Sequence, residues 1–192
     1  MGDAPGQVLL VRHGETAWSA VGRHTSVTDL PLTDVGEEQA RALRPRLAGR
    51  TPALVLTSPR QRARRTAELA GWGTAEVDED LVEWHYGDYE GRTGADVRAE
   101  VPGWSLWTHP VPGGETADEV AARLDRVVER CRAVTSQGRD ALLFAHGHAL
   151  RSLAARWVGL PVADGRLLYL GTGTLSVLGE HRGDPVVLRW NA

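Results

Sequence analysis

Three short apolar runs, each followed at once by polar and reactive residues, constrain the fold of this chain more than any other feature. The runs are Val8–Val11, Ala53–Thr57 and Ala141–Ala145. Continuous rather than alternating apolar character is typical of a strand that is buried on both faces of its sheet. Such strands occur mostly in parallel sheets, whose crossover connections are helices.

Helical patterns do lie between these runs. A helix is predicted from the capping residue Thr33 to Leu47, with Pro45 expected to kink or shorten it. Further helices are predicted from Pro59 to about Ala70, and over Thr93–Val101, Thr116–Thr135 and His148–Val158. Short strands are predicted at Glu76-Val77, Leu175–Leu178 and Val186–Trp190, and a loop at Leu81–Gly91. Together these elements predict an α/β fold, a three-layer sandwich in which a mostly parallel central sheet carries helices on both faces. No linker or repeat divides the sequence, so residues 1–192 are expected to form a single domain.

Charge and cysteine content narrow the class of protein. The net charge of −3 argues against nucleic-acid binding, and no apolar run approaches the roughly 20 residues of a membrane span. Met1–Gln7 lacks the features of a signal peptide, and the lone Cys131 permits neither an internal disulfide nor a thiolate metal cage, so a cytoplasmic location is expected. All 22 basic residues are Arg, whose planar fork suits phosphate.

Reactive residues follow each of the three buried runs. Arg12 and His13 follow the first, Ser58 and then Arg62 follow the second, and His146 follows the third. Because the carboxyl ends of parallel strands share one edge of a sheet, we expect two Arg and two His to meet there. That combination predicts a phosphate site. The His-x-His pair at His146 and His148 is by itself also compatible with a strand cap or a metal ligand pair.

These residues also resemble the conserved blocks of a known family. The blocks are Val11–Glu15, Asp29–Thr33, Gly36, Ser58-Pro59, Arg62-Ala63, Thr66-Ala67, Glu83, Tyr86-Gly87, Glu90-Gly91, Gly114–Thr116 and Ala145–His148. In this order they resemble the histidine phosphatase superfamily, the phosphoglycerate-mutase-like proteins. The likeness is greatest to its phosphatase branch, which includes sedoheptulose-1,7-bisphosphatase and small bacterial broad-range phosphatases.

The resemblance implies a catalytic pair. His13 would attack phosphorus and become phosphohistidine, for which its imidazole must be neutral. Glu83 would protonate the leaving oxygen and then activate water, and the aromatic surroundings of Trp84 and Tyr86 are expected to raise its pKa by desolvation.

The resemblance also implies how the phosphoryl group is held. Arg12, Arg62 and a protonated His146 would bind it, with help from the backbone N–H of Gly147. Ser19 occupies a position where many relatives have Asn. A sugar bisphosphate would need a second cationic patch. The candidate substrate-binding residues are Ser19, Arg23, His24, Thr25, His109, Gly147 and Arg151.

The predicted function is therefore hydrolysis of phosphomonoesters of small metabolites, sugar phosphates or bisphosphates, without metal or cofactor. A homodimer is the candidate assembly. A phosphoglycerate mutase is the alternative within the family, but Arg92–Pro112 is short for a basic lid and the chain has no Lys. Two alternatives lie outside the family. One is a metal-dependent hydrolase built on His146 and His148, and the other is a non-catalytic phosphate-binding regulatory module. The second is disfavoured because both His13 and Glu83 are present.

Overall fold

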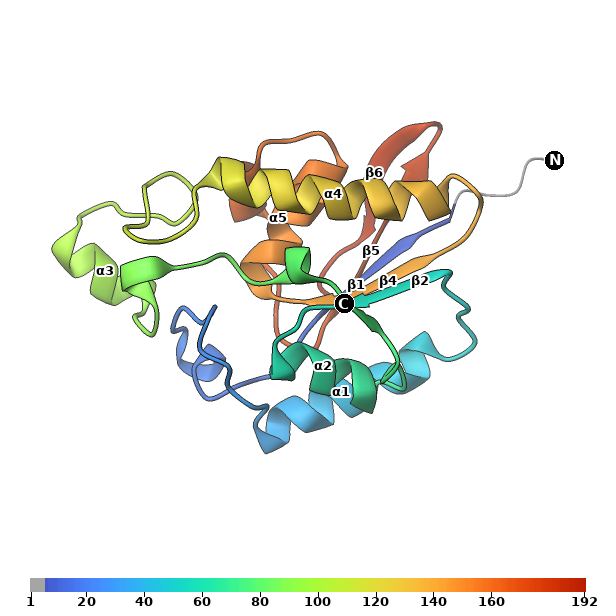
Figure 1. Cartoon of the computed structure of the whole chain (residues 1–192), viewed down its shortest axis with the longest axis horizontal. Coiled ribbons are helices and arrows are strands. Elements are labelled where there is room, and N and C mark those ends of the chain that lie inside the picture. The colour runs from blue at the N-terminus through green and yellow to red at the C-terminus, as the bar shows by residue number, and fades with distance from the viewer. Residues whose placement is uncertain (1–5) are drawn as a thin grey trace.

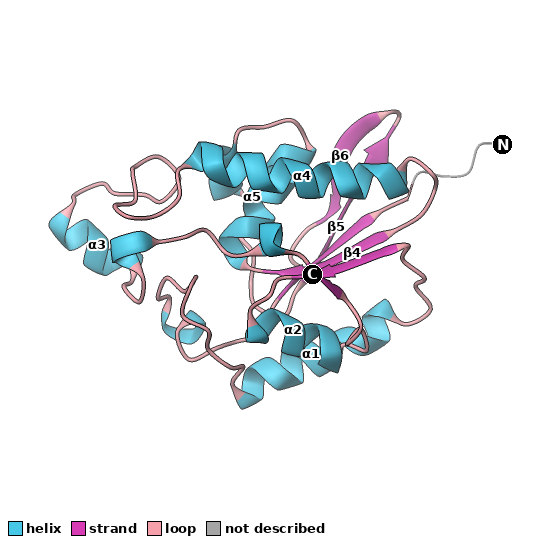
Figure 2. Cartoon of the chain, in the orientation of Figure 1, coloured by secondary structure: helices cyan, strands magenta, loops and turns pink. Residues whose placement is uncertain are grey.

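The computed structural model describes residues 6–192; Met1–Pro5, part of the segment expected not to be a signal peptide, lie outside the described residues. The strands are β1 (Val8–Arg12), β2 (Leu54–Thr57), β3 (Glu76–Val77), β4 (Ala141–Ala145), β5 (Leu175–His181) and β6 (Asp184–Arg189). The α-helices are α1 (Asp34–Leu47), α2 (Gln61–Leu69), α3 (Gly94–Glu100), α4 (Ala117–Thr135) and α5 (Gly147–Trp157) (Figures 1 and 2). Short 3₁₀-helices lie at Ser19–Val21, Glu79–Leu81, Gly87–Tyr89 and Val162–Leu167.

The six strands form one sheet in the order β3-β2-β4-β1-β5-β6. The first four run parallel, and β5 and β6 are antiparallel to their neighbours. Figure 1 shows α4 and α5 on one face of the sheet, α1 and α2 on the other, and α3 away from the sheet. The predicted α/β sandwich with a mostly parallel sheet is confirmed.

The core lies on both sides of the sheet, because successive strand residues point to opposite faces. In β1, Val8 and Leu10 belong to the cluster that includes the apolar side chains of α4 and α5. Leu9 and Val11 belong to a second cluster, which includes Leu43 of α1. Burial on both faces explains why this strand is continuously apolar.

Two local expectations need correction. Pro45 lies inside α1, which still extends to Leu47 as the apolar pattern predicted, so it does not shorten the helix. The last two strands are longer at their shared end than predicted, because β5 continues to His181 and β6 begins at Asp184. Between them Arg182 and Gly183 adopt positive φ angles of 55° and 89°, which close a tight hairpin. The exposed, polar end of this hairpin carries no apolar pattern to detect.

The strand register brings the reactive residues together. Arg12 lies opposite Ala145, and Thr57 lies opposite Phe144. The ladder continues one residue further, because the His13 N–H donates to the Ala145 carbonyl oxygen and the Ser58 N–H to that of Phe144, both at 2.9 Å. The segments after β1, β2 and β4 therefore start side by side at one edge of the sheet.

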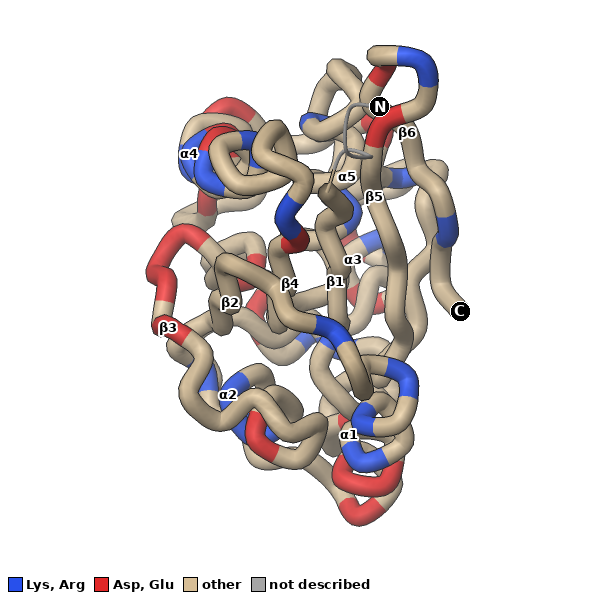
Figure 3. Tube along the Cα trace, turned by 90° about the vertical axis from the view of Figure 1, so that its right-hand side faces the viewer, with Lys and Arg blue, Asp and Glu red and all other residues tan. Residues whose placement is uncertain are grey.

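Positive and negative side chains are interleaved over the surface. Figure 3 shows both Arg and acidic positions in α4, and both also occur in α1. Among the described helices, none combines the length and the apolar character needed to cross a membrane. A cytoplasmic location, a single domain, the absence of nucleic-acid binding and a homodimer stay predictions.

Replacing Leu10 with Ala tests the central position of β1. Leu10 is fully buried, so Leu10→Ala should lower the free energy of unfolding by about 2–5 kcal/mol, measured by urea denaturation. Leu188→Ala is the matched control, because Leu188 is 47% exposed and should change stability by less than about 0.5 kcal/mol. Equal effects of the two substitutions would contradict the assigned core.

Candidate active site

A cavity of about 150 Å³ lies where β1 and β4 end. Nine predicted residues line it: Arg12, His13, Ser19, Arg23, His24, Thr25, Glu83, Gly147 and Arg151. Gly22, Tyr86, His148 and Leu170, which were not among the predicted site residues, complete its lining. The cavity is smaller than the roughly 300–1,000 Å³ of pockets for drug-sized ligands, which suits a small substrate.

His13 is held as a neutral imidazole. Its ring is 4% exposed, and its Nδ1 lies 2.7 Å from the Gly14 carbonyl oxygen. Since a carbonyl oxygen only accepts, Nδ1 carries the proton and Nε2 keeps its lone pair. Burial and then the guanidinium groups of Arg62 and Arg12 lower the pKa of His13 well below its ordinary value. The ring nitrogen Nε2 is therefore available as a nucleophile at neutral pH.

The turn that carries His13 is packed closely against α1 and α2. A Cβ atom on Gly14 would lie 2.1 Å from the Gly36 carbonyl oxygen, so only glycine fits there. The Gly14 N–H donates to Thr66 Oγ1 at 3.0 Å, and that hydroxyl donates to the Arg62 carbonyl oxygen at 2.7 Å. These contacts hold His13 at the end of β1 in a single orientation.

Arg12 lies across the first turn of α5. Its NH1 group donates to the Leu170 carbonyl oxygen, and its buried Nε has no hydrogen-bond partner in the described part of the chain. A Cβ atom on Gly147 would lie 3.3 Å from the Cζ and Nε atoms of Arg12, so glycine lets the guanidinium pack on the helix backbone. An unpaired cationic N–H beside a cavity favours an anionic ligand.

The Glu83 carboxylate contacts the N-terminus of α5. It is 6% exposed; Oε1 accepts from the N–H groups of Trp84 (2.9 Å) and Ala149 (2.8 Å), and Oε2 accepts from that of His148 (3.0 Å). Three backbone N–H groups therefore fix the position of this carboxylate. The expected apolar surroundings of Trp84 and Tyr86 are thus only part of its environment.

Arg62 and His146 lie behind His13 and do not line the cavity. Both are fully buried, and the His146 ring centroid is 5.1 Å from that of His13. The Arg62 Nε–H donates to His146 Nδ1 at 3.3 Å, and the remaining His146 nitrogen lies 2.7 Å from Ser58 Oγ. Direct contact of either residue with a bound phosphoryl group stays a prediction.

His146 is unprotonated in this structure, so the expected protonated form stays a prediction for the phosphate-bound enzyme. Burial, then Arg62, His13 and Arg12, lower the pKa of His146 well below its ordinary value. Because His146 Nδ1 accepts from Arg62, only its Nε2 carries a proton, which is donated to Ser58. His146 therefore holds the Arg62 guanidinium in place rather than adding a positive charge.

Glu90, which was not predicted as part of the site, shapes the loop whose carbonyl oxygens bind Arg62. The Arg62 guanidinium donates to the carbonyl oxygens of Thr28 (3.0 Å), Thr25 (3.1 Å) and Ser26 (3.3 Å). Glu90 shapes this loop, since its carboxylate accepts from the Ser26 N–H (2.9 Å), the Thr28 N–H (3.0 Å) and the Ser26 hydroxyl (2.7 Å). Its presence in a family block was the only signal in the sequence.

Two predicted substrate-binding residues are placed differently from expectation. Ser19 lines the cavity, but its hydroxyl accepts from the Thr16 N–H (2.8 Å) and donates to the Thr16 carbonyl oxygen (3.1 Å), so it is already engaged. His109 is a correction, because it is exposed and its Nδ1 accepts from the Ser105 N–H at 3.2 Å in a local turn. It lines a separate cavity together with the buried Trp107. The Trp107 ring centroid lies 5.2 Å from that of His148, which lines the catalytic cavity.

Tyr86 and His148 join the site without having been predicted as ligands. The Tyr86 hydroxyl lies 2.6 Å from His148 Nδ1. Burial and Glu83 raise the pKa of Tyr86 well above its ordinary value, and burial and Arg151 lower the pKa of His148 well below its own. The phenol therefore donates to the neutral ring. Leu170 contributes a carbonyl oxygen to Arg12, for which the sequence holds no signal.

A model of the histidine phosphatase superfamily (branch 1) matches residues 8–192. The chain belongs to this superfamily. It is 42% identical over 186 residues to an acid phosphatase of Mycobacterium tuberculosis, covering 95% of this chain and 91% of the relative. It is 38% identical to sedoheptulose 1,7-bisphosphatase of Saccharomyces cerevisiae, covering 80% and 68%. The solved structure of a protein encoded by an open reading frame of Mycobacterium tuberculosis superposes on this chain with a TM-score of 0.93. The two chains are 39% identical, and the match covers 97% of both.

The resemblance inferred from the sequence blocks is thus confirmed, and this histidine phosphatase is an enzyme that acts on phosphorylated substrates. The likeness extends over the whole described sheet and its helices rather than over the blocks alone.

The buried His13 and His146 and the half-buried His148 predict how stability depends on pH. In the folded state the pKa values of His13, His146 and His148 are lowered, whereas the unfolded chain binds protons to them near about pH 6.5. The unfolded state therefore gains protons first, and the free energy of unfolding should fall below about pH 6.5, by about 1.4 kcal/mol per pH unit for each histidine.

Urea unfolding in phosphate-free buffer between about pH 7.5 and 5.5 measures this slope. His148→Gln should make the slope shallower by about 1.4 kcal/mol per pH unit, because it removes one of the three groups. Stability that is constant over this range would contradict neutral, buried rings.

Proposed function

We propose that this histidine phosphatase hydrolyses phosphomonoesters of small metabolites through a phosphohistidine intermediate on His13. The carrying observation is the imidazole whose Nδ1–H is bound by the Gly14 carbonyl oxygen, so that Nε2 presents a lone pair beside a small cavity. Arg12 and Glu83 line the same cavity and supply the positive charge and the proton that phosphoryl transfer requires.

In the first half-reaction, His13 Nε2 attacks phosphorus and the bond from phosphorus to the leaving oxygen breaks. Glu83 donates a proton to that oxygen, so the alcohol leaves neutral. The Arg12 guanidinium and the Gly147 N–H, which belongs to the first turn of α5, stabilise the charge on the equatorial oxygens. Burial and, from behind, the Arg62 guanidinium keep His13 unprotonated.

In the second half-reaction, the Glu83 carboxylate takes a proton from water while the water oxygen attacks phosphorus. The bond between phosphorus and His13 Nε2 breaks, and inorganic phosphate leaves. The three backbone N–H groups that contact Glu83 hold its carboxylate in position for this step.

We propose sugar phosphates or bisphosphates as the substrate class. The cavity of about 150 Å³ suits a small substrate, and Arg23, His24 and Arg151 place further cationic or hydrogen-bonding groups on its wall. Two relatives are named an acid phosphatase and a sedoheptulose 1,7-bisphosphatase, which supports a small phosphorylated metabolite. His109, which lies outside the cavity, is not part of this proposal.

The mutase alternative is less supported. A mutase must keep water from its phosphoenzyme. The segment that would do so here, Arg92–Pro112, is short, and its side chains make other contacts. Trp104 and Trp107 are buried in packing, and Arg92 forms an ion pair with Glu100 at 2.6 Å. Hydrolysis, which needs water to reach phosphohistidine, therefore fits this segment better.

A metal-dependent hydrolase also fits poorly. Both ring nitrogens of His146 are engaged, by Arg62 and by Ser58, so that residue has no lone pair for a metal. No group of three or more His, Cys, Asp or Glu within residues 6–192 is arranged to hold an ion.

His13→Asn tests the nucleophile. The variant should lose turnover of p-nitrophenyl phosphate, because an amide cannot form the phosphoenzyme. Wild-type enzyme quenched during turnover should carry an acid-labile, base-stable phosphate on His13, detected by mass spectrometry of the peptide. EDTA should leave the wild-type rate unchanged. Residual turnover of the variant at the wild-type rate would overturn the mechanism.

Glu83→Gln tests the acid by comparing two leaving groups. It should lower kcat/KM for an alkyl phosphate by about 100-fold or more, because an alkoxide needs a proton. For p-nitrophenyl phosphate, whose phenolate leaves without one, the loss should be much smaller. Because kcat/KM reports steps up to release of the alcohol, the later attack of water does not affect it. Equal losses for both substrates would contradict the acid role.

A further inference from the structure

We propose that the ion pair between Glu115 and Arg123, outside the catalytic cavity, is a positioning pair for Glu83. The proposal rests on the acid–base role proposed for Glu83. Residues 83–86 belong to no helix or strand, so neither a helix nor a ladder of sheet hydrogen bonds holds the Glu83 backbone. Its backbone must be held by other contacts, and the two residues of this pair supply several of them.

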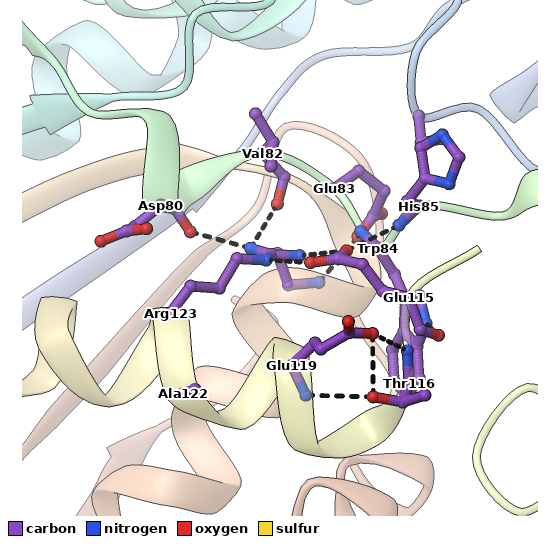
Figure 4. A network of polar contacts seen from close by, with 12 residues as sticks. Asp80, Val82, Glu83, Trp84, His85, Glu115, Thr116, Glu119, Ala122 and Arg123 are labelled. Atoms are coloured by element: carbon purple, nitrogen blue, oxygen red, sulfur yellow. Dashed lines mark hydrogen bonds and ion pairs between the residues drawn. The ribbon is translucent and has the colours of Figure 1, made fainter. Parts of the chain in front are cut away.

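Arg123 holds the chain on the N-terminal side of Glu83. It lies on α4 and is 7% exposed. Its NH1 group donates to the carbonyl oxygens of Asp80 and Val82, both at 2.8 Å (Figure 4). Val82 directly precedes Glu83, so this bond fixes the backbone there. Its Nε and NH2 groups donate to the two oxygens of Glu115 at 2.7 and 3.0 Å.

Glu115 holds the chain on the C-terminal side. Its Oε2 accepts from the His85 N–H at 2.8 Å, and its own N–H donates to the His85 carbonyl oxygen at 3.0 Å. The Glu115 carbonyl oxygen also accepts from the Trp84 indole N–H at 2.9 Å. The pair therefore fixes residues on both sides of Glu83 (Figure 4).

Glu115 is not needed to cap α4, which could otherwise explain its position next to the helix. Thr116 and Glu119 form a complete capping box there, with the Glu119 N–H donating to Thr116 Oγ1 at 3.2 Å and the Thr116 N–H to Glu119 Oε2 at 2.8 Å. The Glu115 carboxylate is thus committed to Arg123 and His85. Arg123 hydrogen-bonds to the segment that carries Glu83, and His85 belongs to that segment.

Loss of the pair should therefore act through the proton transfer. Small displacements of a catalytic group cost up to about 100-fold in rate, because proton transfer requires close and aligned partners. The expected signature is selective: a variant that misplaces Glu83 should slow substrates whose leaving group needs a proton. Substrates with a good leaving group should be affected much less.

Arg123→Met, Arg123→Lys and Glu115→Gln test this with an alkyl phosphate and p-nitrophenyl phosphate. Arg123→Met should lower kcat/KM about tenfold or more for the alkyl phosphate and less than about threefold for p-nitrophenyl phosphate. Glu115→Gln should be selective in the same direction. Arg123→Lys keeps the charge and should recover part of the alkyl phosphate rate.

Arg156→Met is the matched control. Arg156 on α5 likewise donates two hydrogen bonds to Asp125 on α4, at 2.8 and 2.9 Å, but neither side chain hydrogen-bonds to the segment 80–85. Its loss should change kcat/KM for the alkyl phosphate and for p-nitrophenyl phosphate by the same factor. Circular dichroism and thermal melting of every variant establish that the compared proteins are folded, and Glu115→Gln, which preserves side-chain volume, carries the test if Arg123→Met does not fold.

A double-mutant cycle separates this proposal from the catalytic one. In a Glu83→Gln background, Arg123→Met should cause no further selective loss for the alkyl phosphate. If Glu83→Gln itself shows no dependence on the leaving group, the acid role fails. If Glu83→Gln shows that dependence but Arg123→Met and Glu115→Gln slow both substrates equally, or if the effects of Arg123→Met and Glu83→Gln add, the positioning role is overturned.

Discussion

A completely buried guanidinium group, that of Arg62, sets the electrostatics on which the rest of the site depends. Carbonyl oxygens of the loop 25–28 and a histidine nitrogen accept its N–H groups, and Asp29 lies 3.8 Å from it at an exposed position. Because neutral acceptors satisfy the donors without cancelling the charge, its field still reaches His13 and lowers the pKa of that ring. The proposed nucleophile is neutral because its ring is buried and because a charge that water cannot screen lies behind it.

Glu83, the proposed acid–base residue, is held by hydrogen bonds rather than by a buried charge. Glu83 caps the first turn of α5 with its side chain, while Arg123 and Glu115 hold the backbone on either side of it. An irregular segment thus gains the rigidity of two helices. Since α5 also carries Gly147 against Arg12, one helix N-terminus orients both the carboxylate and the phosphoryl site.

Much of this arrangement was predictable from local patterns. Continuous apolar runs identified the buried strands, and the polar residues directly after them identified His13 and His146 as neighbours. Other features were not predictable, because they depend on contacts between distant segments. The protonation state of His146 depends on two partners from the segment after β2, and His109 is excluded by the packing of Trp107. The carbonyl oxygen of Leu170 reaches Arg12 from 158 residues away.

The amino-acid sequence by itself determined the α/β layering, the edge of the sheet at which the site forms and the family to which the chain belongs. Those features follow from burial patterns and residue order, which are properties of short segments. Only the tertiary structure decided which ring nitrogen of His13 is free, which of the predicted residues line the cavity and what holds Glu83 in place. These depend on hydrogen bonds and on charges in a low-dielectric interior, whose effects vary with distances that no local pattern encodes.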